Sequence, residues 1–323
     1  MQEPKLTVIV PAYNVADWLP RCLTSLIQQS YKNLEIIVIN DGSTDATKEV
    51  LDTFAKKDKR IKAIHQKNKG LISVRETGIL RAKGEYVGFV DGDDSVLPDM
   101  YERLINNAIK YEADIAHCGM MYYLEDGRRI PMHGTNELVV YDKYEGLKAL
   151  LRGEKIEPSL CNKIYRKELL MDSCLDPNIL NNEDLLRNYV LFLRADKSIF
   201  EDFCGYIYWR RDGSMSNHRD HVEMCKNILK ARKKILDIAN EQAKQDAYYC
   251  YLATVVYCYN MMIKWKNDNN REFKKYCRQV LRDYVYFLSV LNKRQNLQAL
   301  TIIYMPCIYD VIYKVYLRRR KCR

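Results

Sequence analysis

The sequence lacks several patterns that identify common classes of protein. It has 11 cysteines but no Cys-x-x-Cys pair and no cysteine–histidine cluster, and its five histidines show no metal-ligand spacing. Scattered cysteines in an odd number are typical of reduced thiols in a cytosolic protein, so we expect no disulfide framework. There is also no Gly-x-x-x-x-Gly-Lys-Ser loop and no Gly-x-Gly-x-x-Gly turn, which excludes a P-loop and a dinucleotide-binding fold.

Long apolar segments are also missing. No stretch reaches the roughly 20 apolar residues that a membrane-spanning helix needs. Residues 1–5 do not have the charged, apolar and small-residue order of a signal peptide, so we expect a cytoplasmic protein. The formal net charge of +10 is compatible with anionic substrates, a membrane surface or nucleic acid, and it discriminates poorly among them.

What is present is a regular alternation of strand and helix patterns near the N-terminus. Four apolar or β-branched runs predict buried strands at residues 6–10, 34–39, 61–64 and 86–90. The segments between them carry helical stripes or capping residues. Such alternation with short connections predicts an α/β fold, in which a mostly parallel sheet has helices on both faces.

The rest of the chain changes character. Further strands are expected at 114–124, 138–141 and 198–211, with helices after Pro98, at 144–151 and after Asn182. From about His221 onward every segment is helix-like, including 248–265, 273–291 and 297–316. We therefore predict two parts, an α/β domain over residues 1–218 and an all-helical region over residues 219–323.

Three carboxylates follow the fourth predicted strand. Asp91, Asp93 and Asp94 surround Gly92, and carboxylates packed this closely resist ionising together unless a cation lies between them. Mg²⁺ or Mn²⁺ suits a site that also holds substrate phosphates, and open α/β sheets bind ligands beyond the carboxyl ends of their strands. The alternative is an ordinary surface turn rich in Asp and Gly.

Polar residues also follow the first two strands. Tyr13 can stack on a base, and Asp41 can accept a hydrogen bond from a ring N–H or a ribose hydroxyl. Arg75, on the helix after the third strand, can bind a phosphate through its bidentate fork. Together these residues predict a nucleotide-diphosphate pocket at one edge of the sheet. The alternatives are a half-buried core aromatic for Tyr13 and a turn-former or helix cap for Asp41.

These patterns, taken in order, resemble a known family, the family 2 glycosyltransferases with the GT-A fold. The segments that carry the resemblance are residues 8–14, 39–45, Gly70 with Ser73, Arg75 and Gly78, then 89–94, 162–166, 182–186 and 208–216. The last hundred residues carry no motif of this family. The resemblance implies a Rossmann-like GT-A domain with a mostly parallel central sheet and flanking helices.

The resemblance also implies roles for residues of the donor site. Donor-binding positions are Pro11, Ala12, Tyr13, Asn14, Asp41, Arg75, Asp91 and Gly92. Among them, Asp41 accepts a hydrogen bond from the base, Arg75 lies near the diphosphate, and Asp91 faces the ribose or the donor sugar. In the same Asp-x-Asp motif, Asp93 holds a Mn²⁺ or Mg²⁺ ion that bridges both phosphates.

Further positions match the catalytic and acceptor side of the family. Asp184 matches the general base, with Glu183 beside it, and a positioned base is typically worth roughly 10²–10⁴ in rate. Lys163, Arg211 and Ser214 match positions near the leaving group or the acceptor. The alternatives are an acidic first helical turn for the pair, solvated surface charge for the two cations and an ordinary turn residue for the serine.

Together these inferences predict a metal-dependent, inverting hexosyl- or N-acetylhexosaminyltransferase. Its donor would be a nucleotide-sugar, most simply a UDP-sugar, and its acceptor a hydroxyl of a glycan. From the resemblance alone we expect a lipid-linked oligosaccharide acceptor in bacterial surface-polysaccharide biosynthesis, and no nucleic-acid partner. The lack of spanning helices and of a Gln-x-x-Arg-Trp motif disfavours a processive synthase. A nucleotidyltransferase and a non-catalytic nucleotide-sugar-binding subunit are the alternatives.

The last segment has a composition of its own. Residues 297–316 predict an apolar, aromatic helix, and Arg318 begins a cationic tail. Such a helix can lie at an anionic cytoplasmic leaflet, which suits a lipid-linked acceptor and a peripheral position at the inner face of the cell membrane. The alternative is a helix that docks on the main domain or on a second copy in a homodimer.

Overall fold

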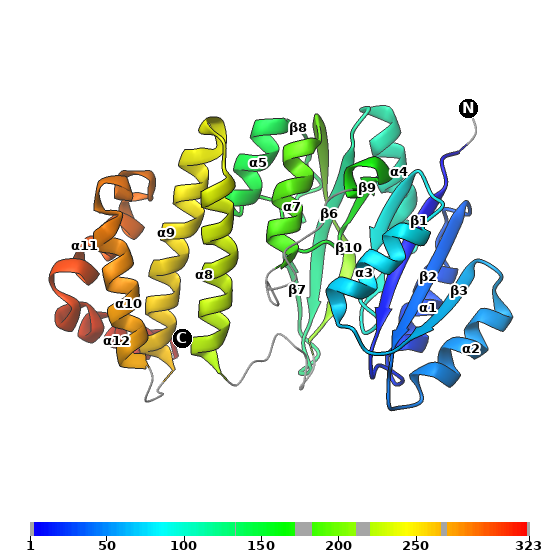
Figure 1. Ribbon diagram of the computed structural model, residues 1–323, viewed down its shortest axis with the longest axis horizontal. Helices are drawn as coiled ribbons and strands as arrows, with labels where there is room; N and C mark the ends of the chain where they lie inside the picture. The colour runs from blue at the N-terminus through cyan, green and yellow to red at the C-terminus, as the bar shows by residue number, and fades with distance from the viewer. Residues whose placement is uncertain (1–2, 133, 172–182, 211–219, 266–269, 322–323) are drawn as a thin grey trace. The chain divides into compact units, whose positions relative to one another are not determined.

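A computed structural model describes residues 3–132, 134–171, 183–210, 220–265 and 270–321 (Figure 1). The chain divides into two compact units. The first comprises Met1–Pro177 and Arg187–Ser214, and the second comprises Asn178–Leu186 and Met215–Arg323. The predicted boundary after residue 218 lies outside the described residues, so the domain limits stay a prediction.

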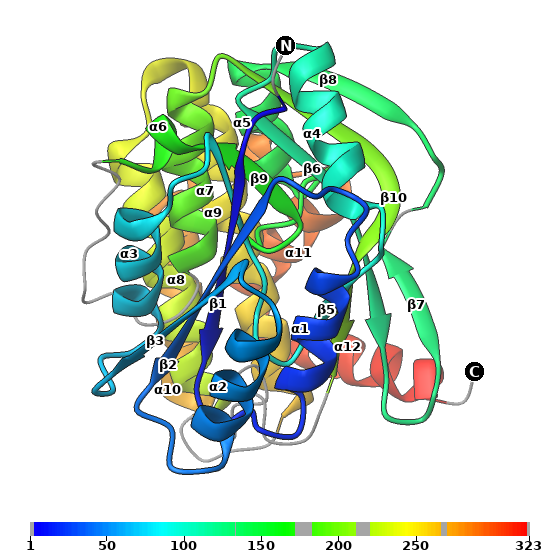
Figure 2. The same cartoon turned by 90° about the vertical axis from the view of Figure 1, so that its right-hand side faces the viewer.

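The first unit is built on a mixed sheet (Figure 2). Its strands are β1 (Leu6–Ala12), β2 (Leu34–Asp41), β3 (Ile61–Gln66), β4 (Tyr86–Phe89), β5 (Ser95–Val96), β6 (Ile115–Tyr123), β7 (Arg129–Met132), β8 (Leu138–Asp142), β9 (Lys163–Arg166) and β10 (Lys197–Trp209). They follow the order β3-β2-β1-β4-β9-β6-β10-β5, with β7 paired to β6 and β8 to β10. The pairs among β3, β2, β1 and β4 are parallel, and so is the β6–β10 pair. The predicted α/β fold with a mostly parallel sheet is confirmed.

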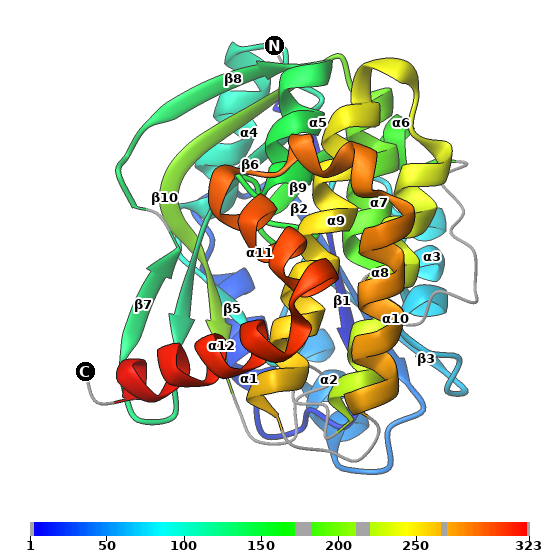
Figure 3. The ribbon, with the colours of Figure 1, turned by 90° about the vertical axis from the view of Figure 1, so that its left-hand side faces the viewer.

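The helices of the first unit cover this sheet. They are α1 (Leu19–Ile27), α2 (Thr47–Lys57), α3 (Leu71–Arg81), α4 (Met100–Lys110), α5 (Lys143–Arg152), α6 (Lys167–Leu170) and α7 (Glu183–Arg194), whose last residues from Arg187 belong to this unit. Figures 2 and 3 show α1 and α3 on opposite sides of β1. β2 is buried along its whole length, and its central residues Ile36–Ile39 are all apolar rather than alternating with polar residues, as is usual for a strand covered on both faces.

Close packing of α3 on the sheet depends on a glycine. A Cβ at Gly78 would lie 2.5 Å from Cγ2 of Ile9 in β1, a distance that real side chains do not reach. The helix therefore approaches β1 more closely than any larger residue would allow. This contact fixes the helix that carries Arg75 against the strand that leads to Tyr13.

Three strands of the sheet were not predicted, namely β5, β7 and the central strand β9. β9 lies between β4 and β6 and is antiparallel to both. Its four residues include a lysine and an arginine and lack the β-branched run that marked the other central strands. Sequence patterns identify a strand from its own residues, whereas β9 is stabilised by two neighbours that are distant in the sequence.

The second unit is helical in its described part. It contains α8 (His221–Ile238), α9 (Glu241–Lys264), α10 (Asn270–Asp283), a 3-10 helix η1 (Val285–Val290), α11 (Lys293–Tyr304) and α12 (Pro306–Lys321). Figure 3 shows α12 crossing α9 of this unit, and the two helices are in contact. Across the described ranges, no helix is long and apolar enough to span a bilayer.

The predicted single helix over residues 297–316 is wrong. The chain leaves the helical conformation at Met305, which has φ −131° and ψ 55°, and α12 begins at Pro306. Proline has no N–H to donate to a carbonyl oxygen of the preceding turn, and it disfavours the helical conformation in the residue before it. The apolar segment is therefore divided into two helices. The predicted helix over 273–291 is divided as well: α10 ends at Asp283, and the 3-10 helix η1 follows from Val285.

Candidate active site

Asn14 joins the ends of β1 and β2. Its backbone N–H donates to Ser43 Oγ (3.0 Å), and its side-chain Oδ1 accepts from the Thr44 N–H (2.8 Å). Asn14 has a φ of 51°, in the left-handed region that asparagine tolerates better than most residues. The preceding Tyr13 is 50% exposed, so it is not part of the core. Two of the predicted donor-binding segments therefore lie side by side.

Asp41 holds the loop that leads into α3. Its side chain accepts from Gln66 Nε2 (2.8 Å), from the Lys69 N–H (2.9 Å) and from the Gly70 N–H (2.8 Å). Gly70 has a φ of +83° and begins α3 as its N-cap residue. A carboxylate offers about four lone-pair positions, so these bonds do not exhaust its capacity. Contact between Asp41 and a base stays a prediction.

The acidic loop after β4 lies between a buried cation and solvent. Arg75 is 2% exposed, and its Nη2 lies 3.6 Å from Oδ1 of Asp91, whose side chain is 37% exposed. The Gly92 N–H donates to the carbonyl oxygen of Pro11 (3.2 Å), next to the buried Ala12 at the end of β1. The ends of β1 and β4 and the helix α3 therefore meet around Asp91; that a donor binds there stays a prediction.

Asp93 and Asp94 have different surroundings. The backbone carbonyl of Asp93 accepts from Arg21 Nη2 (2.6 Å), and its side chain is half-buried. Asp94 is buried and accepts from the Tyr206 hydroxyl (2.6 Å) and from the Trp209 N–H (2.9 Å). Asp94 therefore joins the acidic loop to β10. Sequence patterns did not indicate Tyr206 and Trp209 as its partners, because these contacts join residues more than a hundred positions apart.

The carboxylates of this loop create a negative potential. Burial raises the pKa of Asp94 well above its usual value, and the charges of Asp93 and Asp91 add to the rise. Burial also raises the pKa of the Cys22 thiol, with further contributions from the same three carboxylates. The pKa of the Tyr206 hydroxyl is raised by burial and by Asp94. A cation bound at the loop would offset this potential.

The donor set of the loop is compatible with a divalent cation. Among the residues that the structure describes, no group of three His, Cys, Asp or Glu side chains is placed to hold a metal ion. Mg²⁺ is usually held by one or two carboxylates, with waters and substrate phosphates completing its coordination. Asp93 can provide one such carboxylate, whereas both oxygens of Asp94 already accept hydrogen bonds from protein groups.

Lys163 is not a surface cation, so that alternative is wrong for it. Its side chain is 0% exposed, at the start of β9. Its Nζ donates to the carbonyl oxygens of Glu157 and Ser159 and to Asn162 Oδ1, each at 2.7 Å. Lys163 therefore stabilises the segment before β9. Its predicted place near the leaving group or the acceptor stays a prediction.

The predicted catalytic pair begins α7. Glu183 and Asp184 lie in the first turn of this helix, Glu183 buried and Asp184 half-buried. This position is compatible with the general base and with the alternative of an acidic first turn, so the role of Asp184 stays a prediction. Arg211 and Ser214 lie outside the described residues.

An ion pair joins α7 to α3. Nη2 of Arg187 contacts Oε1 of Glu76, the residue after Arg75. Arg187 is 1% exposed, and its Nε and Nη1 have no hydrogen-bond partner, whereas Glu76 is 28% exposed. Among the described residues, this buried guanidinium therefore has one carboxylate as its ion-pair partner. Sequence patterns missed this pair, because each residue alone resembles an ordinary exposed charge on a helix.

The chain is similar to proteins of known family. Residues 7–173 match the family model described as glycosyl transferase family 2. Over 221 residues the chain is 36% identical to the glycosyltransferase GlyA of Streptococcus pneumoniae serotype 4, which covers 66% of this chain and 32% of that protein. The chain thus spans about a third of the length of this relative.

Two solved structures share the fold. The structure of S. aureus TarS 1–349 in complex with UDP-GlcNAc has a TM-score of 0.70 and 21% identity, over 97% of this chain and 92% of that chain. The mannosyltransferase PcManGT from Pyrobaculum calidifontis, in complex with GDP-Man and Mn²⁺, has a TM-score of 0.58 and 14% identity, over 95% and 88%. At these identities the similarity concerns the fold, and it confirms the GT-A prediction.

Proposed function

The chain belongs to glycosyl transferase family 2, and on that premise we propose that it transfers a hexosyl or N-acetylhexosaminyl group from a UDP-sugar to a hydroxyl of a glycan. The observation that carries the proposal is the meeting of Asn14, Asp41, Arg75 and Asp91 around the carboxyl ends of β1, β2 and β4. A nucleotide donor would lie at this edge of the sheet, where open α/β sheets bind their ligands. The bound UDP-GlcNAc in the TarS structure supports the choice of donor.

The donor would be bound along this edge. Tyr13, Asn14 and Asp41 would contact the uracil and the ribose, with Pro11 and Ala12 forming the floor of the site. Arg75 would bind the diphosphate, since its guanidinium already lies within 3.6 Å of Asp91, which would face the ribose or the sugar. Gly92 lets the acidic loop pack against the end of β1, because a Cβ there would lie 2.9 Å from the carbonyl oxygen of Pro11.

We propose that Asp93 holds a Mn²⁺ or Mg²⁺ ion that the donor phosphates share. Bound there, the metal would offset the charge that develops on the departing diphosphate. The negative potential around Asp94 and Cys22 supports a cation at this loop. The Mn²⁺ in the PcManGT structure supports a divalent metal of this type.

Asp184 would be the general base, with Glu183 beside it. It would take the proton of the acceptor hydroxyl as that oxygen attacks the anomeric carbon. A single displacement of this kind inverts the anomeric configuration. Lys163 would favour the leaving diphosphate through its positive charge rather than by contact, because its side chain is fully buried. Arg211 and Ser214 would complete the leaving-group and acceptor side.

The acceptor would be a glycan on a lipid carrier in bacterial surface-polysaccharide biosynthesis. An enzyme of this kind would work in the cytoplasm, in peripheral contact with the inner face of the cell membrane. The exposed apolar residues of α11 and α12 support such a contact, and they include Leu297, Tyr304, Ile308, Val311 and Ile312.

A screen of nucleotide-sugars tests the proposal. Purified protein is incubated with each donor, with and without EDTA, and release of the free nucleotide is measured. We expect release from a UDP-sugar that needs Mn²⁺ or Mg²⁺ and that is lost in Asp93→Ala. Release of pyrophosphate instead would indicate a nucleotidyltransferase. Unchanged activity of Asp93→Ala would remove the metal assignment.

A further inference from the structure

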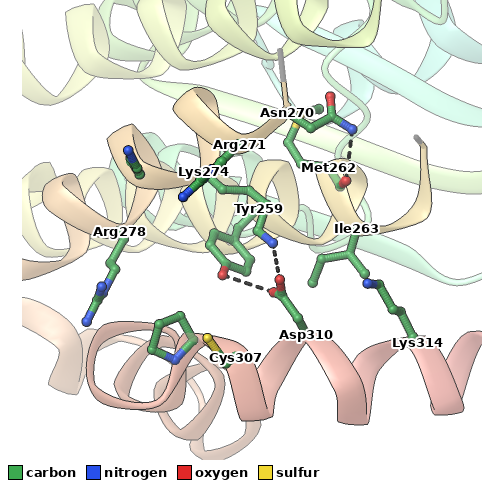
Figure 4. Close-up of a pocket in the computed structure, with 12 residues that line it drawn as sticks. Tyr259, Met262, Ile263, Asn270, Arg271, Lys274, Arg278, Cys307, Asp310 and Lys314 are labelled. Atoms are coloured by element: carbon green, nitrogen blue, oxygen red, sulfur yellow. Dashed lines mark hydrogen bonds and ion pairs between the residues drawn. The ribbon is translucent and has the colours of Figure 1, made fainter. Parts of the chain in front are cut away.

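The helical unit contains a cationic cavity between α9, α10 and α12 (Figure 4). Its volume is about 890 Å³. The polar residues of its lining include Tyr259, Arg271, Lys274, Lys275, Arg278, Asp310 and Lys314. None of them belongs to the proposed transfer site, so the cavity needs an explanation of its own.

The one carboxylate of this lining is already neutralised. Asp310 accepts from the Tyr259 hydroxyl (3.0 Å) and forms an ion pair with Lys274. Figure 4 shows both partners directed toward Asp310 from the facing helices. The carboxylate is therefore unavailable to the remaining cations, which give the cavity a positive potential.

Those cations have little else to bind within the described residues. Arg271, Lys275 and Lys314 form no ion pair there, and Arg278 donates through Nε to the carbonyl oxygen of Ile303 (2.9 Å). Arg271 lies in the first turn of α10, so the positive end of that helix dipole adds to their charge. Lys and Arg heads of this kind are suited to the oxygens of a phosphate group.

The helix that carries Lys314 also exposes an apolar stripe. Ile308, Val311, Ile312 and Val315 are spaced i, i+3, i+4 and i+7, so they lie on one face of α12. Their exposed fractions are 53%, 62%, 59% and 43%. Such a contiguous apolar surface is unusual for a surface that faces water alone, and it marks an interaction site.

The cations continue along the same helix. At 100° per residue, the exposed Arg318 lies about 70° and Lys314 about 110° around the helix from the centre of the stripe, so both border it on the same side. A helix with an apolar stripe and a cationic border is the type that lies in a membrane interface and prefers anionic lipids. A soluble phosphate would use the cavity but would give no reason for the apolar stripe.

We propose that the helical unit binds the phosphate group of an anionic phospholipid in the cavity, while the α12 stripe enters the interface of the bilayer. A phospholipid accounts for both features, because its phosphate suits the cations of the cavity and its bilayer suits the apolar stripe. The inference deepens the proposed membrane contact. Phospholipid binding does not depend on the donor or on sugar transfer. UDP release is therefore measured on the same preparations, so that failure of the transfer proposal can be distinguished from failure of the phospholipid proposal.

Co-sedimentation of the full chain with vesicles tests the proposal. We compare vesicles of phosphatidylglycerol and phosphatidylcholine with those of phosphatidylcholine alone. The test variant is Lys275→Glu/Lys314→Glu. The matched control, Lys226→Glu/Lys234→Glu, changes the net charge equally at exposed positions of α8 that do not line the cavity. A third variant, Val311→Ser/Ile312→Ser, interrupts the stripe.

We expect binding to the anionic vesicles only. Since each basic residue near an anionic surface is worth about 1 kcal/mol, the test variant should bind at least about thirtyfold more weakly, while the control binds nearly as the unchanged chain. The stripe variant should dissociate from the anionic vesicles at a lower salt concentration than the unchanged chain, because its binding depends on charge alone. Circular dichroism checks that each variant is folded.

Three results would overturn the proposal. Equal losses in the test and control variants would show a general charge effect without a site. Binding of inorganic phosphate by calorimetry, without binding to vesicles, would assign the cavity to a soluble ligand. A dimer by analytical ultracentrifugation that Val311→Ser/Ile312→Ser converts to a monomer, again without vesicle binding, would assign the stripe to a second copy.

Discussion

For the buried ion pair between α3 and α7, we predict that substituting its two partners changes stability by different amounts. Removing the charge of Glu76 leaves the buried Arg187 without an ion-pair partner in the part of the chain that the structure describes, where its other two nitrogens also have no hydrogen-bond partner. Removing the charge of Arg187 leaves Glu76, which is 28% exposed and can be hydrated. The two substitutions at one contact should therefore have very different effects on stability.

The magnitude follows from the burial of each partner. Removing one partner of a buried pair costs about 3–5 kcal/mol in the free energy of unfolding. Because water reaches part of Glu76, we expect about 2–4 kcal/mol for Glu76→Gln. Arg187→Met keeps much of the side-chain volume and removes the unpartnered nitrogens, so its free energy of unfolding should change by no more than about 1 kcal/mol.

Urea unfolding followed by tryptophan fluorescence can measure this difference. The three tryptophans are Trp18, Trp209 and Trp265, and the last belongs to the second unit. A Trp265→Phe background restricts the signal to the first unit, where the ion pair lies. The double variant Glu76→Gln/Arg187→Met should have nearly the stability of Arg187→Met alone. If Arg187→Met costs as much as Glu76→Gln, the argument from an uncompensated charge is refuted.

Other predictions concern the proposed base, the acidic loop and one turn. Asp184→Asn should keep its affinity for UDP in calorimetry and lose roughly 10²–10⁴ in transfer rate; wild-type turnover would place the base elsewhere. Burial raises the pKa of Asp94 above its unfolded value, so its contribution to stability is complete below about pH 4 and is lost as the pH rises through the folded pKa. Asp94→Asn should flatten this dependence in urea midpoints measured across pH, and an unchanged slope would contradict the assignment. A residue with a Cβ in the left-handed conformation costs roughly 1–2 kcal/mol. Gly42→Ala should destabilise the first unit by more than this amount, because the new Cβ would also lie 2.7 Å from the backbone nitrogen of Asn68. Gly153→Ala is the matched control, with a φ of +67° and open space around the new Cβ; equal midpoints in urea would show that the close approach costs nothing.

Local patterns predicted much of the sheet because its central strands are buried on both faces. β1, β2 and β4 are mainly apolar and almost fully buried, whereas β3 is partly exposed; polar residues follow β1, β2 and β4 where the ligand edge is expected. β9 and the break at Met305 were not predicted. The first depends on distant partners, and the second requires weighing one proline against a long apolar stripe.

The candidate site was predicted in its segments rather than in its contacts. The positions of Tyr13, Asp41 and Asp91 at the ends of strands followed from the pattern and from the family resemblance. The loop held by Asp41 and the ion pair of Arg187 did not, because both are tertiary contacts between residues without a distinctive spacing. Lys163 shows the same limit, since a buried lysine and a surface lysine look alike in a sequence.

The insertion of β9 between β4 and β6 has a consequence for synthesis and for fragments. β4 and β6 leave the ribosome before β9 exists, and until Lys163–Arg166 emerge each of them has an unpaired edge. A shortened chain that stops before β9 would keep those edges open to other molecules. We therefore expect a fragment that ends before β9 to aggregate rather than to fold as a stable module.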